Sequence, residues 1–331
     1  MADTQDRQAQ DRKRPQAGRS LWADARRRIM GDKSAMICLG VILLYVLVAI
    51  GGAAYEAFAE QAETAKREGG EPVWDLPTFE ETADYDHKNE APTLSSFKRL
   101  FGTDWGGKSV LYKTLLGAKV SITVGFMANI LAVPMGMILG AIAGYYGGKV
   151  DSFIVWLYTT LACIPGIIRL IAIKYAFQDV DFLGLDLKGI HGLYIALALV
   201  TWIGTCRLVR AEVLKIRELD YVLAARAIGT PSFVILLRHV MPNVLHLGII
   251  TFSLGFVGAV KAEVILSYLG LGVDVGVPSW GVMINSARMD LFQGRWWELT
   301  AAVGAMFFLV LALNILGDRL RDALDPKLRN V

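Results

Sequence analysis

The most informative stretch of this chain reads Leu219-Asp-Tyr-Val-Leu-Ala-Ala-Arg-Ala-Ile-Gly-Thr-Pro-Ser-Phe-Val-Ile-Leu-Leu-Arg-His-Val-Met-Pro-Asn243. It lies between two apolar runs of membrane-spanning length and predicts two short helices joined at a glycine. Gly229 can adopt the left-handed conformation that ends a helix, Thr230 suits the N-cap of the next helix, and Pro231 suits its first turn. A compact helical hairpin that projects from a membrane-spanning chain is typical of a surface where a soluble partner docks.

Long apolar runs dominate the 331 residues, of which 54% are apolar and only 20% charged. Roughly 20 apolar residues cross a bilayer as a helix, and only helices or closed barrels satisfy the backbone there. The runs lack the alternation of barrel strands. The sequence therefore predicts an all-α polytopic membrane protein with six transmembrane helices, at about Ser34–Tyr55, Val120–Tyr146, Ser152–Phe177, Gly189–Cys206, Val240–Val260 and Thr300–Gly317.

The distribution of basic residues gives an orientation, because lysine and arginine mark the cytoplasmic ends of membrane helices. They are concentrated before the first run, in the loop from Arg207 to Arg238, and after the last run, whereas the stretch between the first two runs is acidic. We therefore expect both termini and the hairpin to be cytoplasmic. About thirty polar residues precede the first run, too many for an ordinary signal peptide, so this run is expected to be an uncleaved span.

These observations predict five segments. They are a cytoplasmic N-terminal segment at 1–33, a first transmembrane helix at 34–55, an external insert at 56–112, a five-helix transmembrane core at 113–317 that includes the cytoplasmic loop 207–242, and a cytoplasmic tail at 318–331. The insert contains several prolines and aromatic residues, and we expect an irregular cap with short helices. At roughly fifty residues, it is marginal for independent folding.

One motif points to a different function and is rejected. Gly102-Thr-Asp-Trp-Gly-Gly-Lys-Ser109 matches the phosphate-binding pattern G-x-x-x-x-G-K-[ST]. A real phosphate loop follows a buried strand and opens a helix, but the preceding residues have no strand pattern, and the match falls on the external side. We expect a turn instead, with Asp104 capping the segment that leads into the second span.

Cysteine and histidine usage indicates neither disulfides nor a metal. Cys38, Cys163 and Cys206 are scattered in or beside apolar runs, where cysteine behaves as a small apolar residue. His191 and His246 fall on different spans, which disfavours a shared metal ion. The composition gives no indication of nucleic-acid binding.

Small residues and prolines within the spans predict helix packing. Gly136, Gly140 and Gly144 recur every four residues on one face of the second span, a spacing that lets another helix approach closely. Pro134 and Pro165 each remove a backbone hydrogen bond and are expected to kink their helices.

Four charged residues within or at the ends of the spans are candidates for a substrate path, since such charges often mark one. On a straight third span Arg169 would lie about 27 Å from the inner end, where its side chain could snorkel to the outer interface. Contact of Arg169 or Lys174 with an anionic group of a substrate, or with a partner helix, is the alternative. Lys261 and Glu263 end the fifth span and either pair with each other or flank a gate.

The chain resembles the second permease subunit of dipeptide and oligopeptide importers of the ATP-binding-cassette (ABC) class. The resemblance runs from Ser20 to Arg329, apart from much of the insert. It is carried by Ser20-Leu-Trp-Ala-Asp-Ala-Arg-Arg-Arg28, Phe101-Gly-Thr-Asp104, Ala143-Gly-Tyr-Tyr-Gly-Gly-Lys-Val-Asp151, Ser267-Tyr-Leu-Gly-Leu-Gly-Val273, Pro278-Ser-Trp-Gly281 and Leu316-Gly-Asp-Arg-Leu-Arg-Asp-Ala-Leu-Asp-Pro-Lys-Leu-Arg329. The long insert is similar to the subgroup that handles larger peptides, including microcin C.

This resemblance implies a type I importer permease in a bacterial inner membrane, working by alternating access. Its partners would be a second permease, two cytoplasmic ATPases, an external solute-binding protein and membrane lipid, but no nucleic acid. The chain itself would hold no catalytic residue, metal or cofactor, since ATP and magnesium bind the ATPases. The family's glutamate position in the hairpin is Leu223 here. The residues expected to contact an ATPase are Tyr221, Leu223, Ala224, Ala225, Arg226, Gly229, Arg238 and Pro242.

Three alternatives remain open at this point. Related permeases carry nickel chelates or other peptide-like solutes, so the substrate class is less firmly predicted than the permease fold. A membrane enzyme that binds nucleotide through residues 102–109 belongs to a different class. A channel or secondary transporter would need no ATPase.

Overall fold

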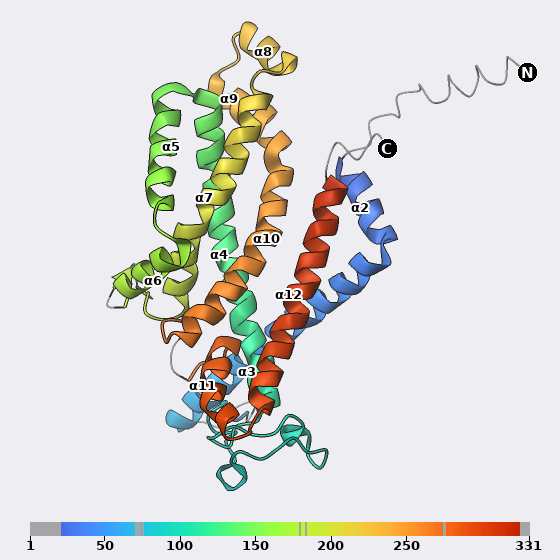
Figure 1. Ribbon diagram of the computed structural model, residues 1–331, viewed down its shortest axis with the longest axis vertical. Coiled ribbons are helices and arrows are strands. Elements are labelled where there is room, and N and C mark those ends of the chain that lie inside the picture. Colours follow the sequence, from blue (N-terminus) through green and yellow to red (C-terminus); the bar gives the residue numbers. More distant parts are fainter. Residues whose placement is uncertain are drawn as a thin grey trace, which may run out of the picture.

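The computed structural model describes residues 21–69, 74, 76–178, 180–182, 184–273 and 276–324. Its long helices form an elongated bundle (Figure 1). The predicted terminal segments lie partly outside the described residues, at 1–20 and 325–331. The elements in chain order are α2 (Leu21–Gly31), α3 (Lys33–Arg67), the 3-10 helices η1 (Tyr85–His87) and η2 (Phe97–Arg99), α4 (Val110–Tyr146), α5 (Gly148–Ala162), α6 (Gly166–Ala176), β1 (Asp181–Phe182), β2 (Leu185–Asp186), α7 (Ile190–Ile216), α8 (Asp220–Ala227), α9 (Ser232–Ile235), the π-helical segment η3 (Leu236–Val240), α10 (Met241–Tyr268), α11 (Trp280–Phe292) and α12 (Trp297–Leu324).

The predicted all-α membrane fold is confirmed. Five described helical segments are long and apolar enough to cross a membrane, namely α3, α4, α7, the continuous run from α9 to α10, and α12. The bent pair α5 and α6 provides a sixth crossing if the two helices together form one span. The two short strands form an antiparallel hairpin between α6 and α7.

The third span is bent at Pro165, where a kink was predicted, and is not the straight helix assumed for the position of Arg169. α5 ends at Ala162, α6 begins at Gly166, and the two helix axes meet at 90°. Pro165 stands at the N-cap of α6, where its missing N–H is tolerated, whereas an α5 that continued through it would lose a hydrogen bond and clash. The straight rise assumed for Arg169 is therefore wrong.

α4 is the central helix, and its glycines allow the predicted close approach of another helix, which is α7. β-Carbons at Gly136, Gly140 and Gly144 would lie only 2.6, 2.5 and 2.9 Å from carbonyl oxygens of Trp202, Cys206 and Arg210. Only residues without a side chain permit such close backbone approach. Pro134 lies inside α4, which continues through it to Tyr146.

The insert begins as a helix and continues as an irregular cap. α3 runs to Arg67, twelve residues beyond the predicted end at Tyr55, because the residues that follow Tyr55 are mostly good helix formers such as alanine and glutamate. From residue 76 onward, the described insert contains turns and the short helices η1 and η2, as expected. Figure 1 places this cap at the end of the bundle opposite α8.

The rejected phosphate-binding motif forms a turn, but Asp104 is not a helix cap. Its carboxylate accepts hydrogen bonds from the backbone N–H groups of Gly106 and Lys108 at 2.9 and 2.8 Å. Ser109 is the N-cap of α4 instead, since its hydroxyl accepts from the N–H of Tyr112. Serine is well suited to this position, because its short side chain reaches the unpaired N–H groups of a first turn.

A buried ion cluster joins the cap to the bundle. Lys113 Nζ lies 2.5 Å from Asp104 Oδ2 and 2.7 Å from Glu298 Oε1. The cluster thus links the insert, the first turn of α4 and the first turn of α12. All three side chains are buried, so each charge depends on the others for compensation.

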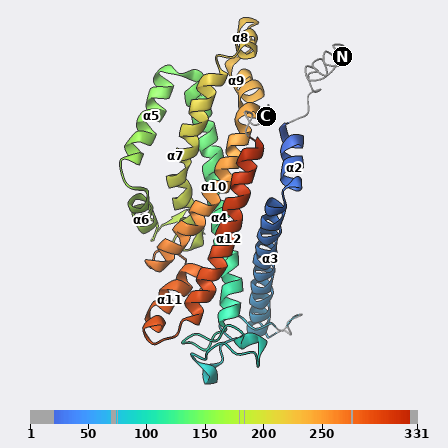
Figure 2. The same cartoon turned by 45° about the vertical axis from the view of Figure 1, so that its right-hand side comes forward.

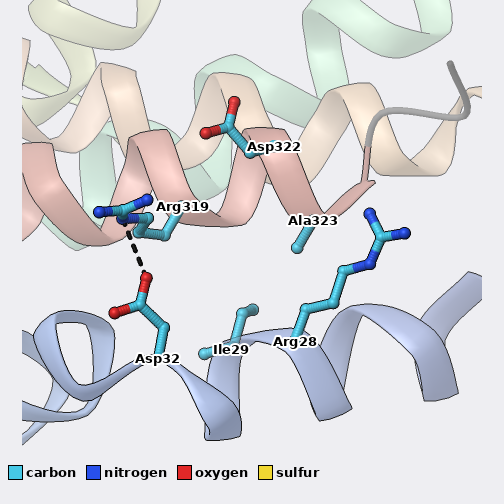
Figure 3. Close-up of a pocket in the computed structure, with 6 residues that line it drawn as sticks. All are labelled: Arg28, Ile29, Asp32, Arg319, Asp322 and Ala323. Carbon is cyan, nitrogen blue, oxygen red and sulfur yellow. Dashed lines mark ion pairs between the residues drawn. The ribbon is translucent and has the colours of Figure 1, made fainter. Parts of the chain in front are cut away.

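The opposite end of the bundle carries a smaller contact between α2, α3 and α12. Figure 3 shows Arg319 of α12 facing Asp32, with Nε and Oδ2 3.1 Å apart. Asp32 is the N-cap of α3 and accepts a hydrogen bond from the Ser34 hydroxyl. That hydrogen bond, with a smaller contribution from Arg319, lowers the pKa of Asp32, so the Asp32 carboxyl is ionised at neutral pH.

Two helices were not predicted from the sequence, α2 and α11. α11 covers Trp280–Phe292, between the fifth and sixth spans, and is too short to cross a membrane. Ser279 caps its N-terminus, and the buried Trp280 donates a hydrogen bond from Nε1 to the Thr114 carbonyl of α4 at 2.9 Å.

Candidate functional site

The hairpin predicted at residues 219–243 is present and protrudes from one end of the bundle (Figures 1 and 2). The N–H groups of Gly229 and Thr230 donate to the carbonyls of Arg226 and Ala225 at 3.0 and 3.1 Å. Gly229 has a φ of +80°, so the predicted left-handed helix end is confirmed. The predicted N-cap is shifted by one residue, because Pro231 occupies the N-cap of α9 and Thr230 precedes it.

One face of the hairpin is built into the protein core. Val222, Ala225 and Ile235 are buried in a single apolar cluster with residues of α4, α7 and α10. Val222 and Ile235 have no exposed surface at all. The buried face of the hairpin is therefore close-packed against these three helices.

The opposite face of the hairpin is apolar and exposed. Ile228 is 83% exposed and Phe233 62% exposed, on either side of the glycine turn. Tyr221 and Leu223 are exposed as well. Large apolar side chains gathered on a protruding surface mark an interaction site. Ile228 and Phe233 were not among the residues predicted from the sequence, although their position beside Gly229 was a usable signal.

Polar contacts hold the base of the hairpin. Tyr221 accepts a hydrogen bond from Asn243 Nδ2 at 3.0 Å, which ties the start of α8 to the start of α10. Partial burial raises the pKa of Tyr221, so its hydroxyl is neutral at physiological pH. Arg217, just before the hairpin, donates to the Gly144 carbonyl at the end of α4 at 3.0 Å.

The helix that enters the hairpin is anchored by a second arginine. α7 extends to Ile216, so Arg207 and Arg210 belong to this helix rather than to the predicted loop 207–242. The guanidinium of Arg210 makes two parallel contacts with the Asp151 carboxylate of α5, at 2.5 and 2.7 Å. Such two-point pairing fixes orientation as well as distance.

Arg226 lies over the ring of Tyr145, with Cζ 5.7 Å from the ring centroid. The two residues line a small pocket of about 320 Å³ together with Arg217 and Ser232. The buried Tyr145 hydroxyl has no hydrogen-bond partner within the described part of the chain. Glu218 lines the same pocket, and its carboxylate already pairs with Arg217 at 2.8 Å. The exposed Arg226 is therefore the guanidinium of this pocket that suits an acidic side chain of a partner.

The remaining predicted docking residues divide between the two faces. Ala224, Arg238 and Pro242 are exposed, whereas Ala225 faces the core. Pro242 lies in the first turn of α10, a position that does not require its missing N–H.

Arg169 and Lys174, two candidates for the substrate path, contact backbone carbonyls. The guanidinium of Arg169 donates to Leu161 at the end of α5 and to Val200 of α7, the latter at 3.2 Å. Helix C-termini leave carbonyls unpaired, so Arg169 caps α5 at the bend. The buried Lys174 ammonium donates to three consecutive carbonyls, those of Leu187, Lys188 and Gly189.

Glu263 and Lys261 do not form the predicted local pair. Glu263 has no exposed surface, and its carboxylate accepts hydrogen bonds from Ser267 at 2.8 Å and Ser121 at 3.1 Å. Lys261 is exposed. Residues two apart on a helix point to different sides, which explains why the two charges do not meet.

Metal binding has no candidate among the described residues, since they contain no cluster of three or more histidine, cysteine or acidic side chains suited to an ion. Cys38, Cys163 and Cys206 are free thiols.

Comparison with known proteins identifies the family. Residues 136–330 match the family described as the binding-protein-dependent transport system inner membrane component. Residues 20–63 match the N-terminal transmembrane domain of oligopeptide transport permease C.

Relatives that align with most of this chain agree with these family matches. The oligopeptide transport system permease protein OppC of Haemophilus influenzae is 33% identical over 94% of this chain and 90% of its own. The dipeptide permease DppC of Bacillus subtilis is 32% identical over 98% and 90%, and the glutathione permease GsiD of Escherichia coli is 33% identical over 96% and 94%. A structure of the methionine ABC transporter MetNI in inward-facing conformations covers 65% of this chain and 94% of that chain, at 17% identity and a TM-score of 0.48. The chain therefore belongs to the family of binding-protein-dependent transport system inner membrane components, as a permease subunit of the ABC importer type.

Proposed function

We propose that this permease imports peptides and that its hairpin is the contact with a cytoplasmic ATPase. The observation that carries the proposal is the two-sided hairpin, in which Ile228 and Phe233 are exposed beside Gly229 while Val222 and Ile235 are fully buried. The exposed face provides an apolar surface for a soluble partner. The buried face connects that surface to the transmembrane helices.

In this proposal, the hairpin transmits movement of the ATPases to the transmembrane helices. ATP and magnesium bind the partner ATPases, and closure of those subunits moves the exposed face. The buried cluster contains Tyr145 of α4, Val213 of α7 and Val244 of α10, so the movement reaches three spans at once. The bundle then alternates between openings to the two sides of the membrane. The pocket beside Arg226 is proposed to receive an acidic side chain of the ATPase, in place of the contact made by the family's glutamate.

The proposed orientation places the hairpin and both termini in the cytoplasm of a bacterial cell, in the inner membrane. The basic residues of the hairpin loop and of the segments next to α3 and α12 support it. The insert then faces outward, on the side of a solute-binding protein, and a second permease completes the translocation path.

Peptides are the proposed substrate class. The relatives with the names oligopeptide, dipeptide and glutathione permease support it. Of the proposed substrate-path residues, Lys261 is the exposed one and could meet a peptide carboxylate. Arg169, Lys174 and Glu263 would act by shaping the path, since each is held by contacts within the chain.

The test is a double substitution at the hairpin tip, Ile228→Ala with Phe233→Ala, in the complete transporter. The few hot-spot contacts near the centre of an interface are worth about 2 kcal/mol or more each. If Ile228 and Phe233 supply such a contact, ATPase retention during purification and uptake of a labelled peptide should fall by at least about tenfold. Phe307→Ala is the matched control, because Phe307 is 56% exposed but lies on α12, outside the apolar cluster that contains the hairpin.

Each alternative function predicts a different experimental result. Full uptake by the double variant would contradict the hairpin's role. Uptake in cells that lack the ATPase would favour a channel or secondary transporter, and nucleotide turnover by the isolated chain would favour an enzyme. Uptake of nickel chelates but not of peptides would retain the permease and change the substrate class.

A further inference from the structure

A groove of about 650 Å³ lies between α3, α4 and α12, directly beneath the insert. Figure 2 shows α3 and α12 side by side, with the insert at the end of the bundle where the groove lies. Tyr45 contributes the α3 wall, Leu111 and Leu115 the α4 wall, and Trp297 and Phe308 the α12 wall. The groove is separate from the hairpin and from the proposed substrate-path residues.

The groove has the depth of one bilayer leaflet. Its α12 wall runs from Trp297 to Phe308, which is a rise of about 17 Å at about 1.5 Å per residue. The hydrocarbon core of a bilayer is roughly 30 Å thick, so the groove covers about one half of it. Two adjacent tryptophans at its outer end, with Trp296 exposed, are typical of the membrane–water interface.

The walls are mostly hydrocarbon, and their hydroxyl groups are already engaged in hydrogen bonds. The hydroxyl of Tyr45 donates to the Ala305 carbonyl at 2.8 Å, that of Thr114 to Val110 at 2.7 Å, and that of Thr300 to Trp296 at 2.9 Å. The indole N–H of Trp297 donates to the Thr103 carbonyl at 3.0 Å, whereas Trp296, at the end next to the insert, is exposed and keeps its indole N–H available to a polar group there. Farther along the groove, a polar ligand would leave its own donors and acceptors unpaired, at a cost of about 1–3 kcal/mol each, so that part of the occupant must be apolar.

The insert closes the outer end of the groove. Pro92, Leu100 and Phe101 contribute to its lining at that end. A membrane-spanning helix of another subunit would have to pass these insert residues to leave the membrane. A hydrocarbon chain can enter the groove from the side and end below the insert. Lys98, exposed on the same segment of the insert, is suited to the phosphate of a lipid head group at the interface.

We propose that the groove binds one acyl chain of a phospholipid from the leaflet next to the insert, and that this chain fills the space between the insert, α3 and α12. The inference goes beyond the transport function and does not depend on it. A bound acyl chain would provide an apolar surface beneath the insert and would stabilise the packing of the insert against α12.

Gly304 provides a direct test. It lines the groove, and a β-carbon added to it would meet no atom within 4 Å. Gly304→Leu should therefore fold normally and fill the groove. Gly40→Leu is the matched control, because Gly40 also has free space around a β-carbon but does not line the groove.

The complete transporter is reconstituted in nanodiscs with a phospholipid that carries a photoreactive group on its acyl chain, and the adducts are mapped by mass spectrometry. We expect adducts on residues 296–308 to exceed those on the lipid-facing part of α3. Gly304→Leu should lower them about tenfold, as loss of roughly 1.4 kcal/mol of chain binding would do, and Gly40→Leu should not. Unfolding temperatures of both variants should equal that of the parent chain.

Two results would overturn the proposal. One is uniform labelling of all lipid-facing helices that Gly304→Leu leaves unchanged, which would mean ordinary annular lipid. The other is capture of the second permease, instead of lipid, by a photoreactive amino acid placed at position 304. Neither result would affect ATPase retention by the hairpin, so failure here is distinguishable from failure of the proposed function.

Discussion

Gly229 shapes the candidate site through its backbone alone. Its φ of +80° turns the chain between α8 and α9 and thereby places Ile228 and Phe233 on the same exposed tip. A β-carbon added there would meet no atom within 4 Å. Substitutions at Gly229 therefore test the conformation of the turn, without a clash that would disturb the rest of the hairpin.

We expect Gly229→Val to reduce ATPase retention severalfold and Gly229→Asn to restore most of it. A side chain in the left-handed region costs about 1–2 kcal/mol, and asparagine tolerates that region better than other residues. Retention is measured by quantifying the ATPase that copurifies with the permease. The control is Gly204→Val on α7, where there is also free space but no positive φ. Equal retention by the two valine variants would show that the turn is dispensable.

For single residues, contacts with sequence neighbours could be predicted from the sequence, whereas contacts with distant residues could not. Gly229 was predictable because its partners are its sequence neighbours. The contacts of Lys174 were not, since they depend on how the loop before α7 folds back. The surroundings of Glu263 were equally hidden, because Ser121 approaches it from another helix.

At the scale of elements, the interface between α4 and α7 depends on the absence of side chains. The β-carbon of any other residue at Gly140 would lie 2.5 Å from the Cys206 carbonyl oxygen. That oxygen belongs to the helix backbone, so it cannot move aside as a flexible side chain would. The two helices would have to separate.

Gly140→Leu should accordingly destabilise the permease by about 1–3 kcal/mol or more and lower its unfolding temperature in nanodiscs. Gly258→Leu serves as the control, because a β-carbon at Gly258 of α10 meets no atom within 4 Å. Similar unfolding temperatures for the two variants would argue against close packing of α4 on α7.

The bend between α5 and α6 allows a second prediction at this scale. Arg169 donates to carbonyls of α5 and α7, so Arg169→Met should destabilise the permease by about 1.5–3 kcal/mol, the usual worth of hydrogen bonds to charged groups. Spin labels on α5 and α6 should report a broader distance distribution by electron resonance. If Arg169 instead contacts substrate, the Michaelis constant for peptide uptake would rise while stability and the distance distribution stayed unchanged.

The apolar runs in the sequence predicted the spanning segments but not every break and helix of the fold. The runs located every spanning segment because lipid demands continuous apolar surface. The composition of the third run does not distinguish a bent pair from a straight helix, but Pro165 correctly predicted a kink there; the size of the bend was not predictable. α11 was missed because thirteen residues are too few for a span, and its packing through Trp280 against α4 is a tertiary feature.

For the whole molecule, α4 is the element that reaches both ends. Its thirty-seven residues rise about 55 Å at about 1.5 Å each. Lys113 lies near the insert end of α4, and Tyr145 lies under the hairpin at the other end. The sequence placed the start of this span at Val120, because Lys113 and Lys119 interrupt the apolar pattern before it. In the fold, Lys113 joins the insert to the bundle.

The last prediction concerns this junction. Lys113→Met leaves the carboxylates of Asp104 and Glu298 buried without their cation, and the loss of one partner from a buried ion cluster costs about 3–5 kcal/mol. We expect a large drop in unfolding temperature and faster proteolysis of the insert. Adding Asp104→Asn and Glu298→Gln to Lys113→Met removes the charges, and this triple variant should recover most of the stability.

Lys119→Met is the control, because the ion pair of Lys119 with Glu56 is partly exposed and such pairs contribute about 1 kcal/mol or less. If Lys113→Met and Lys119→Met unfolded alike, or if the triple variant recovered nothing, charge compensation would not be what holds the insert to the bundle.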